Sequence, residues 1–323
     1  MNILFCSAGR RVELLKNFRR SLSKGSRIIA TDMSPYAPAI YMADAHYLVP
    51  SIFDKSYLPT ILDICRCEKI QAITTLIDPE IEILAKHRGE FEALGIEVLT
   101  PYEETATLCF DKYKLFQHLR ACGIATPDTY GSFLEAKAAI DAGKLTLPVF
   151  VKPRTGSGSV GARRIETLEL LEESCAKDPS LIIQELMQGG DMDADVYIDT
   201  ISHKPVAAFS KRKLETKIGG ASKTVSFKDE KLFTFLQDAL RHFACNGPID
   251  VDLFCRDGQY YLSEINPRFG GAYLHAYGAG VDFIKMIENN VNGRENLPCF
   301  GDYEENVVMM MYDSVVIKKI KDR

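Results

Sequence analysis

The sequence predicts an α/β protein in which a parallel, doubly wound sheet is followed by a mixed α+β half. Over residues 1–100, strand and helix patterns alternate, and the strands are short continuous apolar runs, which is typical of strands buried on both faces of a parallel sheet. After Pro101 the order changes, because consecutive strand patterns are joined by tight turns, which favours antiparallel pairing. The sequence therefore predicts a change of domain near residues 101–110.

The first half contains a regular alternation of expected strands and helices. The second strand ends at Asp32, and the fourth ends just before Asp78. Gly95 closes the last helix of this half. In chain order, the expected strands are residues 2–8, 26–32, 46–50, 71–77 and 96–100, and the expected helices are residues 12–22, 57–70 and 80–95.

The second half is less regular, and it ends in an expected β-hairpin. Residues 231–243 carry an apolar stripe at helical spacing, and two strands then meet at the turn Asp257–Gly258. The other expected helices are 111–123, 135–143 and 167–177, and the expected strands are 147–153, 180–187, 194–202, 204–215, 248–256 and 259–265.

Composition excludes several classes of protein. The 323 residues carry a formal net charge of -5, which argues against binding to nucleic acid through phosphate neutralisation. No window approaches the roughly 18 uninterrupted apolar residues of a membrane helix, and the N-terminus is expected to be a first strand and not a signal peptide. Nine cysteines are scattered without a zinc-like spacing. We therefore expect reduced thiols, a soluble protein and a cytoplasmic location.

A lysine precedes a glycine-rich loop in VFVKPRTGSGSVG. Lys152 stands at the end of an apolar strand, which would hold its compact charge rigidly for phosphate oxygens. The small residues from Gly156 to Gly161 would let backbone N–H groups close over a polyphosphate. The motif is not a P-loop, because the lysine precedes the glycines. The alternative is a surface hairpin with a solvated lysine.

Two features of the first half are weaker candidates for ligand binding. The first turn, SAGRR, has one glycine where a dinucleotide fingerprint has three, so Asp32 is not expected to bind a nicotinamide cofactor. Asp78 and Glu80 follow the fourth strand at the edge where ligands meet open parallel sheets, and we expect them in a substrate pocket. The alternative is that both are ordinary polar residues at a strand end.

The segment LIIQELMQGGD leaves an apolar strand and runs into a glycine pair. Backbone groups after Gln184 could read an adenine edge, and Asp191 could accept hydrogen bonds from ribose hydroxyls. A plain linker between lobes is the default interpretation of this segment alone.

The hairpin at residues 248–266 predicts a metal site. Asp252 and Glu264 are nearly symmetric about the Asp257–Gly258 turn, so they are expected to face each other on adjacent strands. Asn266 and Arg268 continue the alternation on the same face as Glu264. Two carboxylates and an amide oxygen would hold Mg²⁺, which commonly binds through one or two carboxylates plus substrate phosphates.

In this order and spacing, the motifs resemble the ATP-grasp superfamily, and in particular the group of carbamoyl phosphate synthase-like ligases. The resemblance covers essentially the whole chain, with KPRTGSGSVG as the mobile glycine loop and DVDLF with YYLSEINPRFGG as the magnesium hairpin. It implies a pre-ATP-grasp domain at 1–107, a small lobe at 108–186 and a large lobe at 187–323. A full carbamoyl phosphate synthase carries two ATP-binding halves, and this chain has room for one.

The resemblance also implies roles for individual residues. Arg268 and Arg212 would neutralise the transferred phosphoryl group, and His275 is a candidate for contact with substrate or for a structural role. Asp252, Glu264 and Asn266 would hold Mg²⁺ or Mn²⁺. The ATP-binding set would be Lys112, Lys152, Ser157, Gly158, Glu185, Leu186 and Asp191.

The implied reaction is ATP-dependent ligation of a carboxylate to an amine or a thiol through an acyl phosphate, with release of ADP and phosphate. The partners would be small-molecule carboxylate and amine substrates, and a homodimer is left open. We expect Lys152→Ala and Glu264→Ala each to abolish ATP turnover. The alternatives are an enzyme that forms carboxyphosphate or carbamoyl phosphate from bicarbonate, and a non-catalytic ATP-binding subunit.

Overall fold

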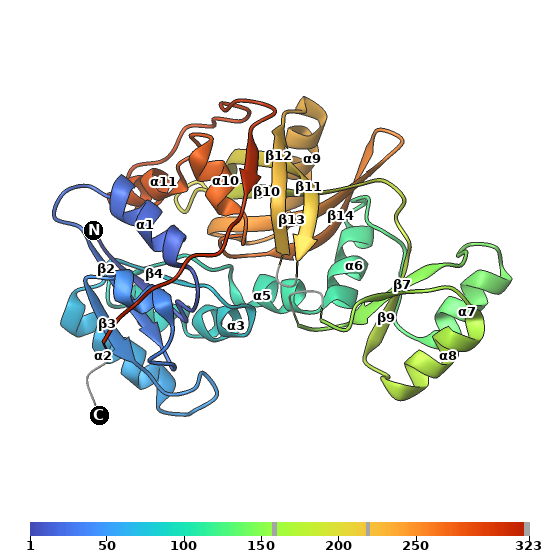
Figure 1. Ribbon diagram of the computed structural model, residues 1–323, viewed down its shortest axis with the longest axis horizontal. Coiled ribbons are helices and arrows are strands. Elements are labelled where there is room, and N and C mark those ends of the chain that lie inside the picture. Colours follow the sequence, from blue (N-terminus) through green and yellow to red (C-terminus); the bar gives the residue numbers. More distant parts are fainter. Residues whose placement is uncertain (157–159, 218–219, 320–323) are drawn as a thin grey trace.

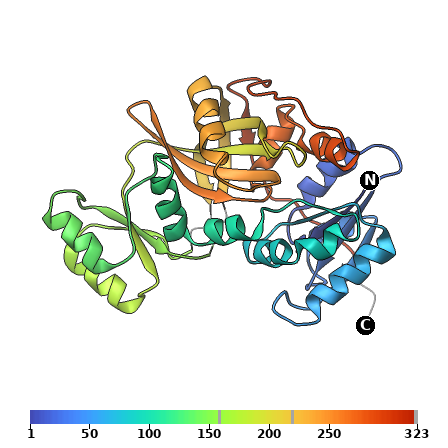
Figure 2. The same cartoon turned by 180° about the vertical axis from the view of Figure 1, so that it is seen from behind.

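The computed structural model describes residues 1–156, 160–217 and 220–319. Figures 1 and 2 show three bodies along the longest axis of the molecule. The N-terminal sheet lies at one end, a small sheet with helices α7 (Phe133–Asp141) and α8 (Leu168–Lys177) lies at the other, and a large sheet lies between them. The predicted fold, a parallel α/β domain followed by a two-lobed unit, is confirmed.

The N-terminal sheet is parallel throughout and has the order β3-β2-β1-β4-β5. Its first strand is central, so the carboxyl ends of β1 and β4 form the switch point where a ligand crevice is expected in an open sheet. The strands are β1 (Asn2–Cys6), β2 (Arg27–Asp32), β3 (Ala45–Leu48), β4 (Ala72–Thr75) and β5 (Glu97–Val98).

Helices cover both faces of this sheet, as its buried strands require. The helix expected at 80–95 is divided at His87 into α3 and α4. The helices are α1 (Val12–Ser21), η1 (Pro38–Met42, a 3-10 turn), α2 (Tyr57–Glu68), α3 (Asp78–Lys86) and α4 (Arg88–Glu92).

The small sheet is antiparallel and has the order β6-β9-β7-β8. Its strands are β6 (Thr129–Tyr130), β7 (Val149–Pro153), β8 (Arg163–Ile165) and β9 (Leu181–Glu185), and it has its own apolar core with α7 and α8. Two helices precede it, α5 (Glu103–Phe110) and α6 (Lys112–Ala121), and Leu115 and Leu119 of α6 pack into the core of the large sheet instead. The division at residues 107 and 186 therefore remains a proposal.

The large sheet is antiparallel and has the order β14-β13-β10-β11-β12-β15. Helices α9 (Glu230–Leu240), α10 (Tyr273–Gly278) and α11 (Phe283–Val291) pack around it, and the chain then returns toward the N-terminal domain (Figure 1). The strands are β10 (Gly190–Ile198), β11 (Pro205–Lys217), β12 (Gly220–Phe227), β13 (Gly247–Arg256), β14 (Gln259–Asn266) and β15 (Val308–Met310). Within the described ranges, no helix is long and apolar enough to cross a membrane.

Candidate active site

A cavity of about 840 Å³ opens between the small sheet and one face of the large sheet. This volume falls in the range of about 300–1,000 Å³ that small-molecule and cofactor sites occupy. Strands β7 and β9 contribute one side, and strands β10, β11, β13 and β14 contribute the other. The structure brings together at this cavity the predicted residues Lys112, Lys152, Glu185, Leu186, Asp191, Asp252, Glu264, Asn266 and Arg268.

Two lysines enter the cavity from the side of the small sheet. Lys152 lies on β7 with only 7% of its surface exposed, and its Nζ lies 2.7 Å from Glu264 Oε1. Lys112 begins α6, where the Asp111 side chain caps the helix by accepting from the backbone N–H of Tyr113 and Lys114. Its Nζ donates to Gly156 O at 2.5 Å. Ser157 and Gly158, predicted for the closing loop, lie outside the described residues.

The hairpin of β13 and β14 carries the predicted metal ligands. Asp252 pairs with Glu264 across the hairpin, and Asn266 Nδ2 donates to Asp252 Oδ2 at 3.1 Å. A register shift follows Asp252. Among the described residues, no group of three or more histidine, cysteine, aspartate or glutamate side chains forms a metal cluster. Two carboxylates and one amide oxygen nevertheless fit Mg²⁺, because Mg²⁺ is commonly bound by one or two carboxylates together with phosphate oxygens.

The floor of the cavity also holds charged residues that the sequence reasoning missed. Lys213 of β11 lies 2.9 Å from Asp191, 2.7 Å from Asp193 and 2.7 Å from Asp252. Beneath it, Lys211 and Asp195 form a fully buried ion pair at 2.5 Å. The signal was present in the period-two alternation of DMDAD on β10 and KRK on β11, since alternate strand residues share a face.

This network shifts the pKa values of its carboxylates in opposite directions. Burial and the nearby Asp252 raise the pKa of Asp250 to about 6. Burial would also raise the pKa of Asp252, but Lys213 outweighs it and lowers that pKa to about 2. Although burial alone would lower the pKa of Lys213, its three carboxylates raise it. Asp252 is therefore ionised at neutral pH and able to act as a ligand.

Arg212 does not line the cavity, unlike the other arginine predicted for catalysis, Arg268. Arg212 has the opposite parity from Lys211 and Lys213, is exposed, and lies with its guanidinium carbon 4.2 Å from the centre of the Phe227 ring. The prediction named the arginine of the KRK run, whereas the strand pleat places Lys211 and Lys213 on the opposite face, where Lys213 lines the cavity and Lys211 is buried against Asp195.

We expect Arg212→Met to leave ATP turnover close to that of the wild type. Its cation–π contact is at an exposed site, so the loss of unfolding free energy should be about 0.5–1 kcal/mol. Thermal melting and ADP release measure the two effects. A collapse of turnover in a variant that melts normally would return Arg212 to the catalytic set.

The predicted nucleotide hinge follows β9. The backbone N–H of Glu185 donates to Asp128 O at 2.9 Å. The Glu185 carboxylate accepts hydrogen bonds from the backbone N–H of Asp128 and from the Arg256 side chain. Leu186 N–H has no hydrogen-bond partner in the part of the chain that the structure describes. Gly189 is required by close approach, since a Cβ there would lie 2.2 Å from Cys255 O. Leu186 also lines the cavity, so its backbone N–H is a candidate donor to a ligand there.

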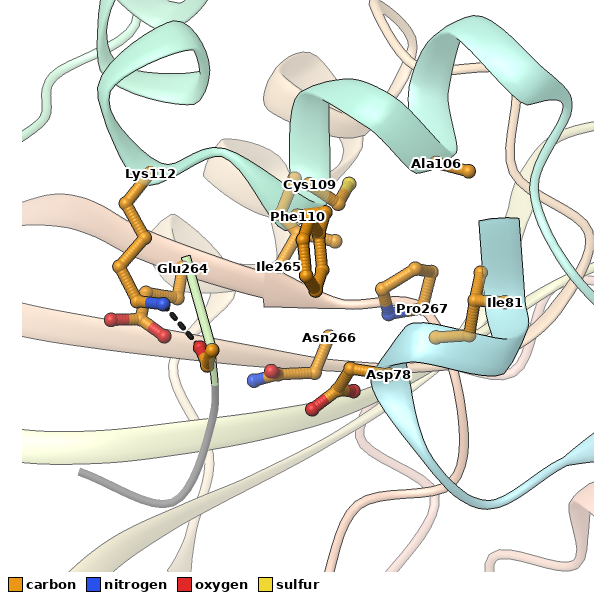
Figure 3. Close-up of a pocket in the computed structure, with 11 residues that line it drawn as sticks. Asp78, Ile81, Ala106, Cys109, Phe110, Lys112, Glu264, Ile265, Asn266 and Pro267 are labelled. Atoms are coloured by element: carbon orange, nitrogen blue, oxygen red, sulfur yellow. Dashed lines mark hydrogen bonds between the residues drawn. The ribbon is translucent and has the colours of Figure 1, made fainter. Parts of the chain in front are cut away.

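Asp78 reaches the site from the N-terminal domain. It begins α3 and accepts from Arg268 Nε at 2.8 Å and Arg268 Nη2 at 3.4 Å. A crevice of about 20 Å³, which is room for about one water molecule, continues from the cavity toward it. Figure 3 shows Lys112, Glu264, Asn266 and Asp78 across this crevice, contributed by α6, β14 and α3.

Two predicted substrate residues do not line the cavity. Glu80 is fully buried below the switch point and accepts a hydrogen bond from Thr75 Oγ1. His275 is 3% exposed, its Nδ1 lies 2.7 Å from Thr224 Oγ1, and burial lowers its pKa to about 4. Both are polar residues beside functional segments, but helix α3 turns Glu80 toward the sheet while Asp78 faces Arg268.

The buried Glu80 predicts a pH dependence of stability. Burial, with a smaller contribution from Asp32, raises its pKa from 4.5 to about 8. The native state therefore holds a proton that the unfolded state releases, so this carboxyl should lower stability progressively as pH rises from about 4.5 to about 8. Glu80→Gln should melt at a higher temperature than the wild type at pH 8.5, with the difference shrinking at pH 5. An equal difference in melting temperature between Glu80→Gln and the wild type at both pH values would contradict the raised pKa of Glu80.

Comparisons with known proteins give the class of this protein, an ATP-dependent ligase. A model described as an ATP-grasp domain matches residues 109–272, and one described as a PylC-like N-terminal domain matches residues 3–99. The ATP-grasp model spans half of the chain, so this protein belongs to the ATP-grasp family.

Individual relatives agree with this family. The chain is 25% identical over 255 residues to a D-alanine–D-alanine ligase of Bacillus anthracis. This alignment covers 71% of this chain and 84% of the relative. Its fold is similar to that of N5-carboxyaminoimidazole synthetase from Staphylococcus aureus complexed with ADP, with a TM-score of 0.76, 16% identity and coverage of 96% and 81%. An L-amino acid ligase from Bacillus licheniformis aligns with a TM-score of 0.68, 16% identity and coverage of 92% and 75%.

Proposed function

We propose that this protein ligates a small-molecule carboxylate to an amine, using ATP to form an acyl phosphate and releasing ADP and phosphate. The observation that carries the proposal is the convergence of Lys152, Lys213 and Arg268 with the carboxylates Asp252 and Glu264 on one cavity. A carboxylate is a poor acyl donor because its oxide is a poor leaving group, and phosphorylation replaces that group by phosphate. The substrate classes named for the ligase relatives also support it.

Within this proposal, the residues divide the chemistry. Lys112 and Lys152 bind phosphate oxygens, and Lys213 joins them in place of Arg212. Leu186 N–H and the carbonyl of Glu185 contact the adenine, and Asp191 accepts from the ribose. Asp252, Glu264 and Asn266 would hold Mg²⁺ or Mn²⁺, which would supply charge neutralisation at the transferred phosphoryl group.

Arg268 acts at the second step in this proposal. When the amine attacks the acyl phosphate, the carbonyl oxygen becomes an oxyanion, and a fixed cation stabilises that charge without having to reorganise. Arg268 is held by Asp78 on one side and is 3.9 Å from Asp250 on the other, so its guanidinium is oriented before substrate arrives. The proton released by the amine leaves to solvent or to product phosphate.

A hydroxylamine trap tests the proposal without knowledge of the amine. Hydroxylamine attacks an acyl phosphate and gives a stable hydroxamate, so amino acids and other carboxylates can be screened one at a time for hydroxamate and ADP. We expect at least one organic carboxylate to give both in equal amounts. ADP release with bicarbonate alone would favour the carboxyphosphate alternative, for which the similar fold of the N5-carboxyaminoimidazole synthetase is the supporting observation. Nucleotide binding without ADP from any acid would favour a non-catalytic subunit.

Two further properties are proposed with it. All nine cysteines are free, which fits a reducing compartment such as the cytoplasm. The second property is a homodimer. It is supported by the similar fold of the biotin carboxylase domain dimer of a 2-oxoglutarate carboxylase from Hydrogenobacter thermophilus, which aligns with a TM-score of 0.73. Light scattering of the purified chain measures its mass in solution.

A further inference from the structure

The N-terminal domain contacts the active-site loop through Arg11. This residue ends the turn between β1 and α1, and its Nη2 donates to Phe269 O at 3.0 Å and to Gly270 O at 2.6 Å. Both carbonyls belong to the loop between β14 and α10, residues 267–272, which also carries Arg268. The turn itself is held in place, because Gly9 N–H donates to Asp32 Oδ2 at 2.8 Å and Ala8 N–H donates to Thr31 O at 3.0 Å.

Arg11 is not kept there by an ion pair. In the described part of the chain, no carboxylate lies within ion-pairing distance of its guanidinium, although Arg11 is partly buried. Burial, followed by the nearby charge of Arg268, lowers its pKa to about 10. Placing one guanidinium beside another costs free energy, and the charges of Asp250, Asp195 and Asp78 offset part of that cost from beyond ion-pairing distance. The two carbonyls are the direct hydrogen-bond acceptors that fix where the guanidinium lies.

The two arginines share one acceptor. Phe269 O accepts from Arg11 Nη2 at 3.0 Å and also from Arg268 Nη1 at 3.3 Å. Arg11 therefore fixes an oxygen atom that in turn orients the guanidinium of Arg268. The other contacts that orient Arg268 come from Asp78, from Asn266 Oδ1 at 3.5 Å and from Asp250 at 3.9 Å.

The same loop is pinned from its other side. Gly270 packs so closely on two carboxylates that a Cβ there would lie 2.8 Å from both Asp195 Oδ1 and Asp250 Oδ1. The Phe269 ring is buried and meets Phe18 of α1 edge-on, with ring centroids 5.5 Å apart. Helix α1 thus holds the side chain of Phe269, while Arg11 holds its carbonyl.

We propose that Arg11 is a positioning residue: it fixes the backbone of residues 269–270 so that Arg268 faces the reacting phosphoryl and carbonyl groups. The role of Arg268 rests on the proposed function, whereas the effect of Arg11 on the loop does not. A displacement of about 1 Å can cost on the order of 10²-fold in rate when a catalytic group is misplaced. Arg11 makes the N-terminal domain part of the catalytic geometry and not only a support.

The test compares Arg11→Met and Arg11→Lys with Arg10→Met. Arg10 is the neighbouring residue of the same turn and is exposed, so its replacement controls for loss of one positive charge. With the acid found by the hydroxylamine screen, kcat of Arg11→Met should fall on the order of 10²-fold, while the Kd of a non-hydrolysable ATP analogue with Mg²⁺ stays within about threefold. The kcat of Arg11→Lys should fall less than that of Arg11→Met. Added guanidinium chloride at low concentration should restore part of the activity of Arg11→Met.

Hydrogen exchange gives a readout that needs no substrate. The backbone N–H of Arg268 donates to Asn266 O at 2.8 Å, and that of Tyr273 donates to Gly270 O at 3.3 Å. Both N–H groups should exchange faster in Arg11→Met than in the wild type, and their exchange rates should be unchanged in Arg10→Met. Unaltered exchange in this loop would overturn the proposal, as would a kcat within threefold of the wild type. A parallel loss of kcat, analogue binding and melting temperature without rescue by guanidinium would assign Arg11 a purely structural role. If the wild type itself forms no hydroxamate, the proposed function fails while the exchange result still decides the role of Arg11.

Discussion

Replacing Glu264 by glutamine should reduce ATP turnover on the order of 10³-fold, the size of effect seen when a preorganised electrostatic contact to a transition state is removed. Glu264 lies across from Asp252 in the hairpin and lines the cavity beside Lys152. A glutamine keeps the size and one oxygen, so the loss would come from the charge. The measurement is ADP release with saturating MgATP and the acid identified by the hydroxylamine trap.

The same substitution should also affect stability, because Glu264 neutralises a buried lysine. Lys152 has its Nζ 2.7 Å from Glu264 Oε1, and its side chain is 9% exposed against 25% for Glu264. Removing one partner of such a pair leaves a charge in a poorly solvated place, which is more costly than removing both. We expect Glu264→Gln to melt below the wild type, and Lys152→Met/Glu264→Gln to recover part of the difference while staying inactive.

These two variants separate catalysis from folding. Glu185→Gln is a matched control, since Glu185 also lines the cavity and pairs with a cation, Arg256, at 2.7 Å. Its side chain holds the hinge and is not among the proposed ligands, so its turnover should fall far less than that of Glu264→Gln. Parental turnover by well-folded Glu264→Gln would remove Glu264 from the metal site.

The parallel first half and the pairing within the hairpin could be predicted from the sequence, because in both a local pattern carries its own geometry. The hairpin is one case, because its turn lies between Asp252 and Glu264 and symmetric positions about a turn face each other. The parallel first half is another, since its continuous apolar strands fit burial on both faces. The hairpin prediction needed fewer than about 40 residues, the scale of one supersecondary motif, and the first half repeats such a motif along the chain.

Contacts across the chain could not be obtained in this way. Whether Arg212 or Lys213 faces the cavity depends on which face of β11 is turned toward it, and a strand sequence with charges at three successive positions does not decide this. Glu80 and Asp78 are two residues apart at the start of α3, yet one is buried against Thr75 and the other meets Arg268. Arg11 contacts carbonyls 258 and 259 positions away, and backbone acceptors leave no trace in side-chain patterns.

Replacing Lys213 by methionine should reduce ATP turnover about 10²–10³-fold and, in the absence of nucleotide, strengthen Mn²⁺ binding. The ammonium of Lys213 lies within 2.7–2.9 Å of Asp191, Asp193 and Asp252. Lys152 forms a similar ion pair with Glu264. In the nucleotide-free protein, both proposed carboxylate ligands are therefore already neutralised by lysines of the chain.

This arrangement predicts that metal and nucleotide bind together. Phosphate oxygens attract both lysines, and each lysine that turns to a phosphate leaves a carboxylate available for a cation. Wild-type protein should then bind Mn²⁺ weakly alone and tightly with an ATP analogue. In Lys213→Met the carboxylates lack their cation, so nucleotide-free Mn²⁺ affinity should rise by roughly tenfold or more, which is about 1.4 kcal/mol.

Electron paramagnetic resonance of free Mn²⁺ measures this affinity directly, and the melting temperature supplies a second readout, because a ligand that binds only the folded state raises it. Mn²⁺ should raise the melting temperature of Lys213→Met more than that of the wild type. Lys223→Met is the control, since Lys223 lies on the neighbouring strand and pairs with Glu215 at 2.7 Å outside the cavity-lining set. Equal Mn²⁺ affinity in wild type and Lys213→Met would mean that Lys213 does not compete with a cation for Asp252, and the joint binding of metal and nucleotide would need another cause.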